Sequence, residues 1–325
     1  MYGDPVITVD PPGGGHPAPT ATYPVPTTVP THFVFDHATQ KSVIALWVFF
    51  GVFAGGLVGV AVLASRVERR FRIFHTLSSL ALAAVTIAYF ALATGLGSTH
   101  GRYHGNSFST SAFGKGGGHH GGEPHRPGGP PAVDYIIRQV FWGSQTVRLF
   151  STPLLVIELA LLSGLAPLAA LAAITYDVLV ESSALITATF PGHWRGRVRG
   201  PWAGWFAFTS VWTVALFVTL FIPGVNATRH RPAAVKGQYY LLTVLLFVAT
   251  IAAGIVFTLG NGLNVISVDA EVISTGVIDV ITYLGFTYFL LLVHVHGEDD
   301  TWEFPAWFVE HRVGIRLDGA EPEAT

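Results

Sequence analysis

The sequence predicts an all-α membrane protein, a bundle of seven transmembrane helices with the N-terminus outside and the C-terminus inside. Half of the 325 residues are hydrophobic and only 12% are charged, about half the charged fraction of a soluble domain. Seven apolar stretches each approach the ~20 residues that a helix needs to cross a bilayer. A basic segment after the first stretch sets the orientation.

Composition also excludes several classes of function. The formal net charge is −2, so the chain lacks the basic surface that nucleic-acid binding requires. It has no cysteine, which excludes disulfides, thiolate metal sites and cysteine nucleophiles. No nucleophile–base spacing or metal motif is present. We therefore expect neither an enzyme nor catalytic residues.

Residues 1–41 are rich in Pro, Thr and Gly, which predicts a disordered extracellular tail. No basic region leads into an early apolar core, so we expect no cleavable signal peptide. The transmembrane domain is predicted over residues 42–296, followed by a cytoplasmic tail over 297–325. The predicted spans are 43–64, 74–96, 135–162, 168–189, 202–222, 239–259 and 267–294.

Basic residues in the connections predict the topology. Four arginines follow the first span, which places that connection in the cytoplasm: Arg66, Arg69, Arg70 and Arg72. Three more arginines, between the fourth and fifth spans, oppose this assignment: Arg195, Arg197 and Arg199. The glycosylation sequon at Asn226 would face the cytosol, so we expect it to be unmodified.

The connection over residues 97–134 is predicted to be an external loop rich in Gly and His. Its histidines are His100, His104, His119, His120 and His125. Clustered imidazoles can bind zinc or copper. Nothing in this glycine-rich stretch pre-organises a tetrahedral ligand set, so we expect no metal site.

Ionisable residues inside the predicted spans mark the candidate site, because charge in hydrocarbon is costly and usually functional or paired. They form a candidate intramembrane polar network: Arg148, Asp279, Asp177, Glu181, Glu158 and Glu271. At about 1.5 Å of rise per residue, Arg148 and Asp279 both lie roughly 18–20 Å from the outer ends of their helices. Asp177 is also near mid-membrane. Arg148 should therefore pair with Asp279 or Asp177.

Two interpretations of this network stay open at the sequence level. In the first, Arg148 belongs to a buried ion pair that sets helix register and has no transport role. In the second, a polar relay runs from Glu271 through Asp279 and Arg148 toward Glu158 and serves protons or signalling.

Several motifs show that the chain resembles the microbial rhodopsin family, most closely its fungal branch. They are YFALA at 89–93, STPLLVIELALLSGL at 151–165, and the spacing of Glu271 and Asp279 in the last span. The resemblance implies a seven-helix fold that binds retinal as a protonated Schiff base on a lysine of the seventh span.

The chain departs from that pattern at its most important position. Tyr283 stands where the family has the retinal lysine, and none of the predicted spans contains a lysine; the three lysines are Lys41, Lys115 and Lys236. A Schiff base requires a primary amine, so we expect no covalent retinal and no cofactor. The Tyr283 hydroxyl should instead bond Asp279, one turn away.

Further family positions are changed as well. Val147 stands at the counter-ion position, Ser144 replaces the family's arginine, and Arg148 replaces a tryptophan. The family's aromatic cage in the sixth span is reduced to small residues: Ala249, Ala252, Ala253 and Val256. The family residues that remain are Thr152, Pro153, Glu158, Glu271 and Asp279.

The resemblance therefore implies the retinal-free, opsin-related subgroup, whose members are non-photoactive proteins of the plasma membrane. It implies a regulatory or chaperone-like role within the lipid bilayer toward other membrane proteins such as a proton ATPase. Two alternatives stay open. One is a proton or ion pathway along the polar network. The other is a receptor that binds a retinoid or lipid non-covalently in a pocket widened by the small residues of the sixth span. The sequence leaves the partner and the oligomeric state open.

Overall fold

The computed structural model describes residues 33–67, 72–105, 134–190, 193–194, 197–198 and 200–296. Within these residues, seven helical segments are long and apolar enough to cross a membrane, which confirms the predicted seven-helix bundle. Five of them are built on α1 Gln40–Ser65, α2 Ile73–Ala93, α4 Trp142–Ser163, α5 Pro167–Thr189 and α6 Gly200–Thr219. The other two are built on α8 Ala233–Phe257 and on α9 Val268–Asp279 with α10 Phe286–His296.

Three of these segments contain π-helical turns, in which hydrogen bonds skip one residue more than in an α-helix. The fifth segment continues from α6 through η2 (Leu220–Gly224), α7 (Val225–Ala227) and the 3₁₀ turn η3 (Thr228–His230). The sixth ends in η4 (Thr258–Gly262). In the seventh, η5 (Val280–Gly285) joins α9 to α10.

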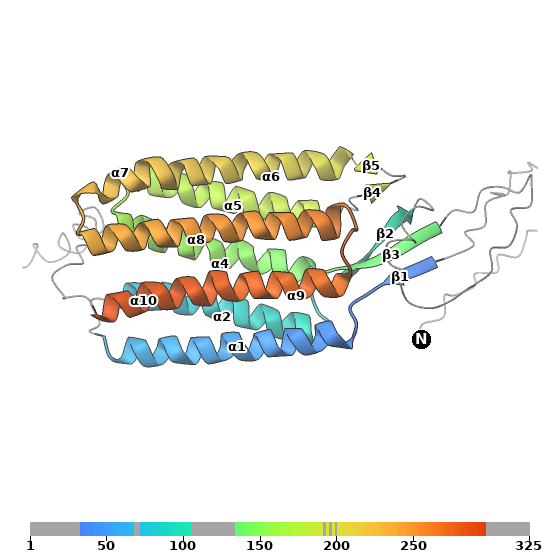
Figure 1. Ribbon diagram of the computed structural model, residues 1–325, viewed down its shortest axis with the longest axis horizontal. Helices are drawn as coiled ribbons and strands as arrows, with labels where there is room; N and C mark the ends of the chain where they lie inside the picture. Colours follow the sequence, from blue (N-terminus) through green and yellow to red (C-terminus); the bar gives the residue numbers. More distant parts are fainter. Residues whose placement is uncertain are drawn as a thin grey trace, which may run out of the picture.

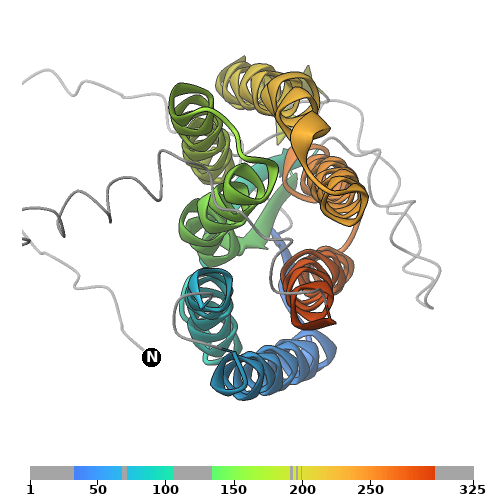
Figure 2. The same cartoon turned by 90° about the vertical axis from the view of Figure 1, so that its left-hand side faces the viewer.

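The helices lie side by side along the long axis of the molecule (Figure 1) and form a closed ring when viewed down the bundle (Figure 2). Most helices pack against their neighbours in sequence, and α9 closes the ring against α1. At this closure Thr39, which caps α1, donates its hydroxyl proton to Asp269 of α9 at 2.6 Å, and Ser42 donates to the same carboxylate. The first and last helices are thus joined by hydrogen bonds at one end of the bundle.

A small sheet lies at the end of the bundle where α1, α4, α6 and α9 begin (Figure 1). Its strand order is β1-β3-β2-β4-β5, with β1 parallel to β3 and β2 antiparallel to β3. The strands are β1 Phe33–Asp36, β2 Thr99–Gly105, β3 Asp134–Val140, β4 His193–Trp194 and β5 Arg197–Val198.

This sheet lies outside the helical bundle and changes the prediction at three places in the chain. Strand β3 occupies the beginning of the predicted third span, so α4 begins at Trp142 rather than at residue 135. A short apolar run next to a helix does not reveal by periodicity whether it is helix or strand. Strand β1 lies in the predicted tail and β2 in the predicted loop. The disorder prediction for residues 1–32, the cytoplasmic tail and His119, His120 and His125 fall outside the described residues.

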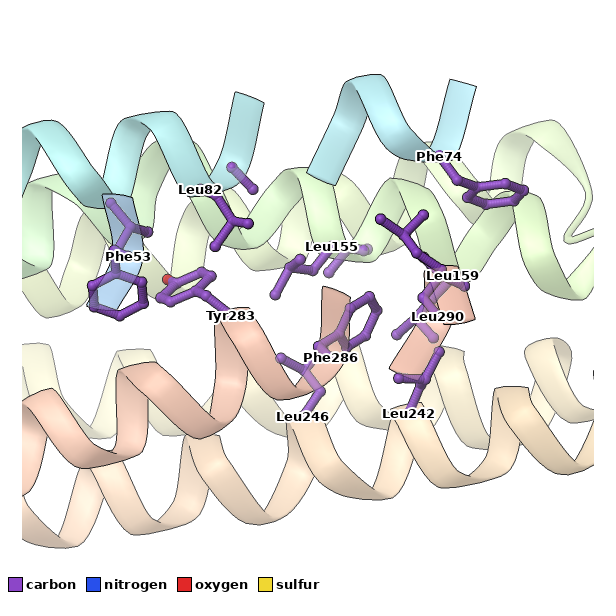
Figure 3. Packing of buried hydrophobic residues seen from close by; sticks show 14 of the residues in the cluster. Phe53, Phe74, Leu82, Leu155, Leu159, Leu242, Leu246, Tyr283, Phe286 and Leu290 are labelled. Atoms are coloured by element: carbon purple, nitrogen blue, oxygen red, sulfur yellow. The ribbon is translucent and has the colours of Figure 1, made fainter. Parts of the chain in front are cut away.

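The core is a continuous apolar layer along the bundle axis, part of which Figure 3 shows. Phe53, Leu82, Leu155 and Phe286 come from four different helical segments and are fully buried, and Tyr283 packs among them (Figure 3). The exposed large hydrophobic residues lie mainly on the outer faces of the helices. A helix that is apolar both inside and outside is expected where the outer face meets lipid.

Candidate functional site: a buried arginine–carboxylate centre

The centre of the site is Asp279, whose side chain is 5% exposed and lies where α9 passes into the π-helical turn η5. Its Oδ1 accepts a hydrogen bond from Arg148 Nη2 of α4 at 2.6 Å. Its Oδ2 accepts one from the Tyr89 hydroxyl of α2 at 2.7 Å. Arg148 thus pairs with one of the two partners that the depth estimate predicts, and both carboxylate oxygens are hydrogen-bonded.

Tyr283 lies in η5, and its hydroxyl accepts a hydrogen bond from Ser151 of α4 at 2.8 Å. The predicted bond between Tyr283 and Asp279 is wrong, because Tyr89 bonds the carboxylate instead. The prediction used the four-residue spacing of a regular α-helix, whereas a π-helical turn begins directly after Asp279. Figure 3 shows the Tyr283 ring near Leu82 and Phe53, and the side chain is almost fully buried.

Another arginine, the fully buried Arg138 of β3, lies at the sheet end of the bundle and was not predicted as a site residue. Its guanidinium bonds Asp36 of β1 and Glu271 of α9, both at 2.6 Å, and its side chain is fully buried. It also donates to the Asn264 side chain and to the carbonyl of Ile266 at 2.9 Å. The sequence signal was an arginine within an apolar, β-branched run that borders a transmembrane span.

Glu271 and Glu158, the two ends of the predicted relay, form their hydrogen bonds with residues other than Asp279 and Arg148. Glu271 bonds Arg138, and Glu158 accepts a hydrogen bond from Ser78 at 2.6 Å. Glu158 lies ten residues after Arg148 on α4, roughly 15 Å along the helix. Leu155, Phe286 and Leu290 are fully buried in this part of the bundle (Figure 3). Among the described side chains, no continuous hydrogen-bonded chain from Glu271 to Glu158 is found, so the relay stays a prediction.

Asp177 and Glu181, one turn apart on α5, are 4% and 8% exposed. Thr152 of α4 is a polar neighbour of both carboxyl groups. Glu181 also interacts electrostatically with Arg148 and Asp279. The centre therefore includes side chains from α2, α4, α5 and the seventh segment.

No family model matches the sequence. Among curated proteins, the chain is 28% identical over 291 residues to Opsin-1 of Neurospora crassa, which covers 88% of this chain and 87% of the relative. It is 24% identical over 250 residues to Protein FDD123 of Trametes versicolor, covering 76% and 75% of the two chains.

Solved structures give the same fold. The light-driven proton pump of Leptosphaeria maculans superimposes with a TM-score of 0.69 at 21% identity, covering 81% of this chain and 97% of the pump. Halorhodopsin, a light-driven chloride pump, gives 0.63 at 18% identity, covering 79% and 97%. The chain has the microbial rhodopsin fold. In sequence, the chain is similar to Opsin-1 over most of the length of both chains.

Retinal attachment in this rhodopsin fold needs an amine in the seventh segment, and Tyr283 supplies a phenol that already bonds Ser151. The structure corrects one detail of the prediction, since two of the helices do contain a lysine. Lys41 is the second residue of α1, and Lys236 is the fourth of α8. Neither lies in the seventh segment. The residues at this position do not fit a covalently attached retinal.

Two cavities adjoin the Arg148 centre of this rhodopsin-fold bundle. One of about 40 Å³ lies toward the sheet end, where Tyr89, Gln145, Arg148 and Glu271 line it. A cavity that holds one water requires roughly 10–15 Å³, so this one has room for only a few. The other has a volume of about 420 Å³ and extends from Arg148 and Glu181 outward between α6 and α8. Arg148 borders both.

Proposed function

We propose that the protein is a non-photoactive, opsin-like integral membrane protein that cannot form a retinylidene Schiff base and is not an enzyme. It acts in the plasma membrane as a regulatory or chaperone-like factor, through contacts with lipid and with other membrane proteins such as a proton ATPase. The observation that carries the proposal is the buried phenol of Tyr283, bonded to Ser151 where the family has its retinal lysine.

The surroundings of Arg148 support the same proposal. Val147 and Ser144 stand at two positions where the family resemblance implies charged residues, and neither can serve as a proton acceptor or as a cation. Leu155, Phe286 and Leu290 are fully buried in the part of the bundle between Arg148 and Glu158 (Figure 3). A light-driven pump needs a chromophore, a proton acceptor and a connected donor, and this arrangement favours none of the three.

Incubation of the purified protein with all-trans retinal tests the proposal. We expect no red-shifted absorption band and, after borohydride reduction, no mass increase from a retinyl–amine adduct. A light-driven pump treated in parallel is the positive control. A reducible adduct on the wild-type protein would overturn the proposal, whatever the wavelength of its band.

The regulatory role is tested by affinity purification from native membranes. We expect other membrane proteins to co-purify with the wild-type chain at stoichiometric yield. Reconstituted vesicles should show no proton flux in light or darkness. Flux that Asp279→Asn and Glu158→Gln both abolish would contradict the regulatory proposal and support the proton-pathway alternative.

A further inference from the structure

The larger cavity is a window between two consecutive transmembrane segments. It has a volume of about 420 Å³, within the roughly 300–1,000 Å³ that ligand pockets usually have. Its rim includes Val214 of α6 with Ile251 and Ile255 of α8, all of which are exposed on the outer face of the bundle. In a membrane this face meets hydrocarbon, so the window opens sideways toward lipid.

Aromatic contacts hold α6 and α8 together at both ends of this window. Toward the sheet, Trp202 stacks on Phe257 with ring centroids 6.2 Å apart and donates its indole proton to Asn261 at 2.9 Å. Toward the other end, the rings of Phe217 and Phe247 meet at 4.9 Å. Between these contacts the lining is small and weakly polar: Thr209, Ser210, Thr213, Thr250, Ala253 and Gly254. The opening is thus framed on both sides and is part of the helix packing.

The inner end of the window is polar, because Gln145, Arg148 and Glu181 line it. A guanidinium has five N–H donors, and Arg148 forms its ion pair with Asp279 through Nη2. The positive charge of Arg148 is thereby balanced, so a charged ligand group would add an uncompensated charge at this depth. A hydroxyl group is uncharged, accepts a hydrogen bond from a guanidinium and donates one to a carboxyl group.

We propose that the window binds a lipid alcohol, an apolar molecule with one hydroxyl group, that enters from the bilayer between α6 and α8. Its hydroxyl lies at Arg148 and Glu181, and its apolar body lies along the threonines and Gly254. Sterols and long-chain alcohols share this chemistry. The inference concerns a non-covalent site, so it stands or fails independently of the proposed absence of photochemistry.

Binding is tested on the purified full chain in nanodiscs with dehydroergosterol, a fluorescent sterol alcohol, by energy transfer from the tryptophans. We expect saturable binding. Gly254→Leu should lower the affinity about tenfold or more, since a Cβ at Gly254 meets open space and the leucine side chain would fill the window. Gly237→Leu is the matched control on α8, where a Cβ also meets open space outside the cavity lining, and it should bind as wild type does. Equal affinity of the Gly254→Leu variant would overturn the site.

The thermal unfolding of both glycine variants without sterol separates loss of the site from misfolding. We expect both to unfold at or above the wild-type temperature, because leucine favours helix over glycine. The Gly254→Leu variant would be misfolded if it melted well below Gly237→Leu. In that case a Thr213→Leu variant, on the opposite wall of the window, is used instead. It must show the same loss of sterol binding. Normal binding by Thr213→Leu would then overturn the proposal.

The head group is tested with the matching sterol ketone, which cannot donate a hydrogen bond to Glu181, and with oleate, which is charged. We expect the ketone to bind several-fold more weakly than the alcohol and oleate not to displace the sterol. A ketone that binds as well as the alcohol, or displacement by oleate, would overturn the hydroxyl assignment. If hexadecanol displaces the sterol, the site binds long-chain alcohols in general. If hexadecanol does not displace it, the site recognises the sterol ring system. A retinyl adduct in the borohydride experiment would overturn only the absence of photochemistry.

Discussion

Two arginines, the fully buried Arg138 and the largely buried Arg148, balance their charges in different ways. Arg138, at the sheet end, bonds two carboxylates, a side-chain amide and a backbone carbonyl, and its side chain is fully buried. Arg148, in the middle of the bundle, pairs with one carboxylate, and its side chain is 13% exposed. Arg148 also lines both cavities, whereas Arg138 lines neither.

This difference distinguishes a structural junction from a site that can bind a ligand. The partners of Arg138 come from β1, from α9 and from the connection before α9, so this residue ties the sheet to the seventh segment. Its hydrogen bonds are directed to fixed protein groups. Arg148 lies on the inner wall of a lipid-facing cavity. The N–H groups of Arg148 that do not bond Asp279 can donate hydrogen bonds to a ligand in that cavity. The four predictions below test this comparison, in order of decreasing expected effect.

Arg138→Ala should have the largest effect on stability. The change leaves Asp36 and Glu271 near each other without their shared cation, and breaking a buried ion pair from one side costs about 3–5 kcal/mol. The free energy of unfolding, measured with a denaturing detergent in mixed micelles, should fall by about 4 kcal/mol. Arg138→Lys keeps the charge and should recover part of the loss. If the free energy of unfolding fell by less than about 1 kcal/mol, Arg138 would not be a structural junction.

Arg148→Ala should be the next most harmful change, with a loss of about 3 kcal/mol, because Asp279 then stays buried without a cation. Asp279→Asn should cost less, since the amide oxygen still accepts the hydrogen bond from Tyr89. Expression yield and unfolding free energy of the two variants give the comparison. Normal yield and stability of Arg148→Ala would refute the pairing as a stabilising interaction.

Tyr89→Phe should reduce the unfolding free energy by about 2 kcal/mol, since it removes a hydrogen bond to a charged acceptor. The change deletes one oxygen atom and keeps the ring that packs against Phe49 and Phe53. In the Asp279→Asn background the same substitution should cost about 1 kcal/mol, because the acceptor is then uncharged. Equal losses in both backgrounds would argue against a charged Asp279.

Tyr283→Phe should have the smallest effect, about 1 kcal/mol, because the hydrogen bond that its hydroxyl accepts comes from the neutral Ser151. The ring, which fills the core, is retained. The same measurement on Ser151→Ala should give a loss of similar size. If Tyr283→Phe is more destabilising than Tyr89→Phe, then Tyr283 and not Tyr89 is the main tyrosine partner of the centre.

Much of the architecture follows from the sequence alone. Seven apolar stretches near the length of the bilayer predict seven spanning helices, because backbone groups in hydrocarbon must be satisfied within each segment. The ion pair of Arg148 and Asp279 could also be predicted from the sequence, since a constant rise per residue converts sequence position into depth in the membrane. The replacement of the retinal lysine by Tyr283 can be read directly from the residue type.

Other features depend on tertiary structure. Strand β3 was predicted as helix, because DYIIRQV is apolar and adjoins a transmembrane span, and only its pairing with β1 and β2 makes it a strand. Arg138 was therefore missed, as was its pairing with Asp36 and Glu271, which are distant in sequence. Tyr89 rather than Tyr283 bonds Asp279, because the π-helical turn alters the spacing on which the prediction relied. The window between α6 and α8 likewise exists only in the packed bundle. Aromatic rings hold the two helices together at both ends of the window, and small side chains between these contacts leave the helices apart.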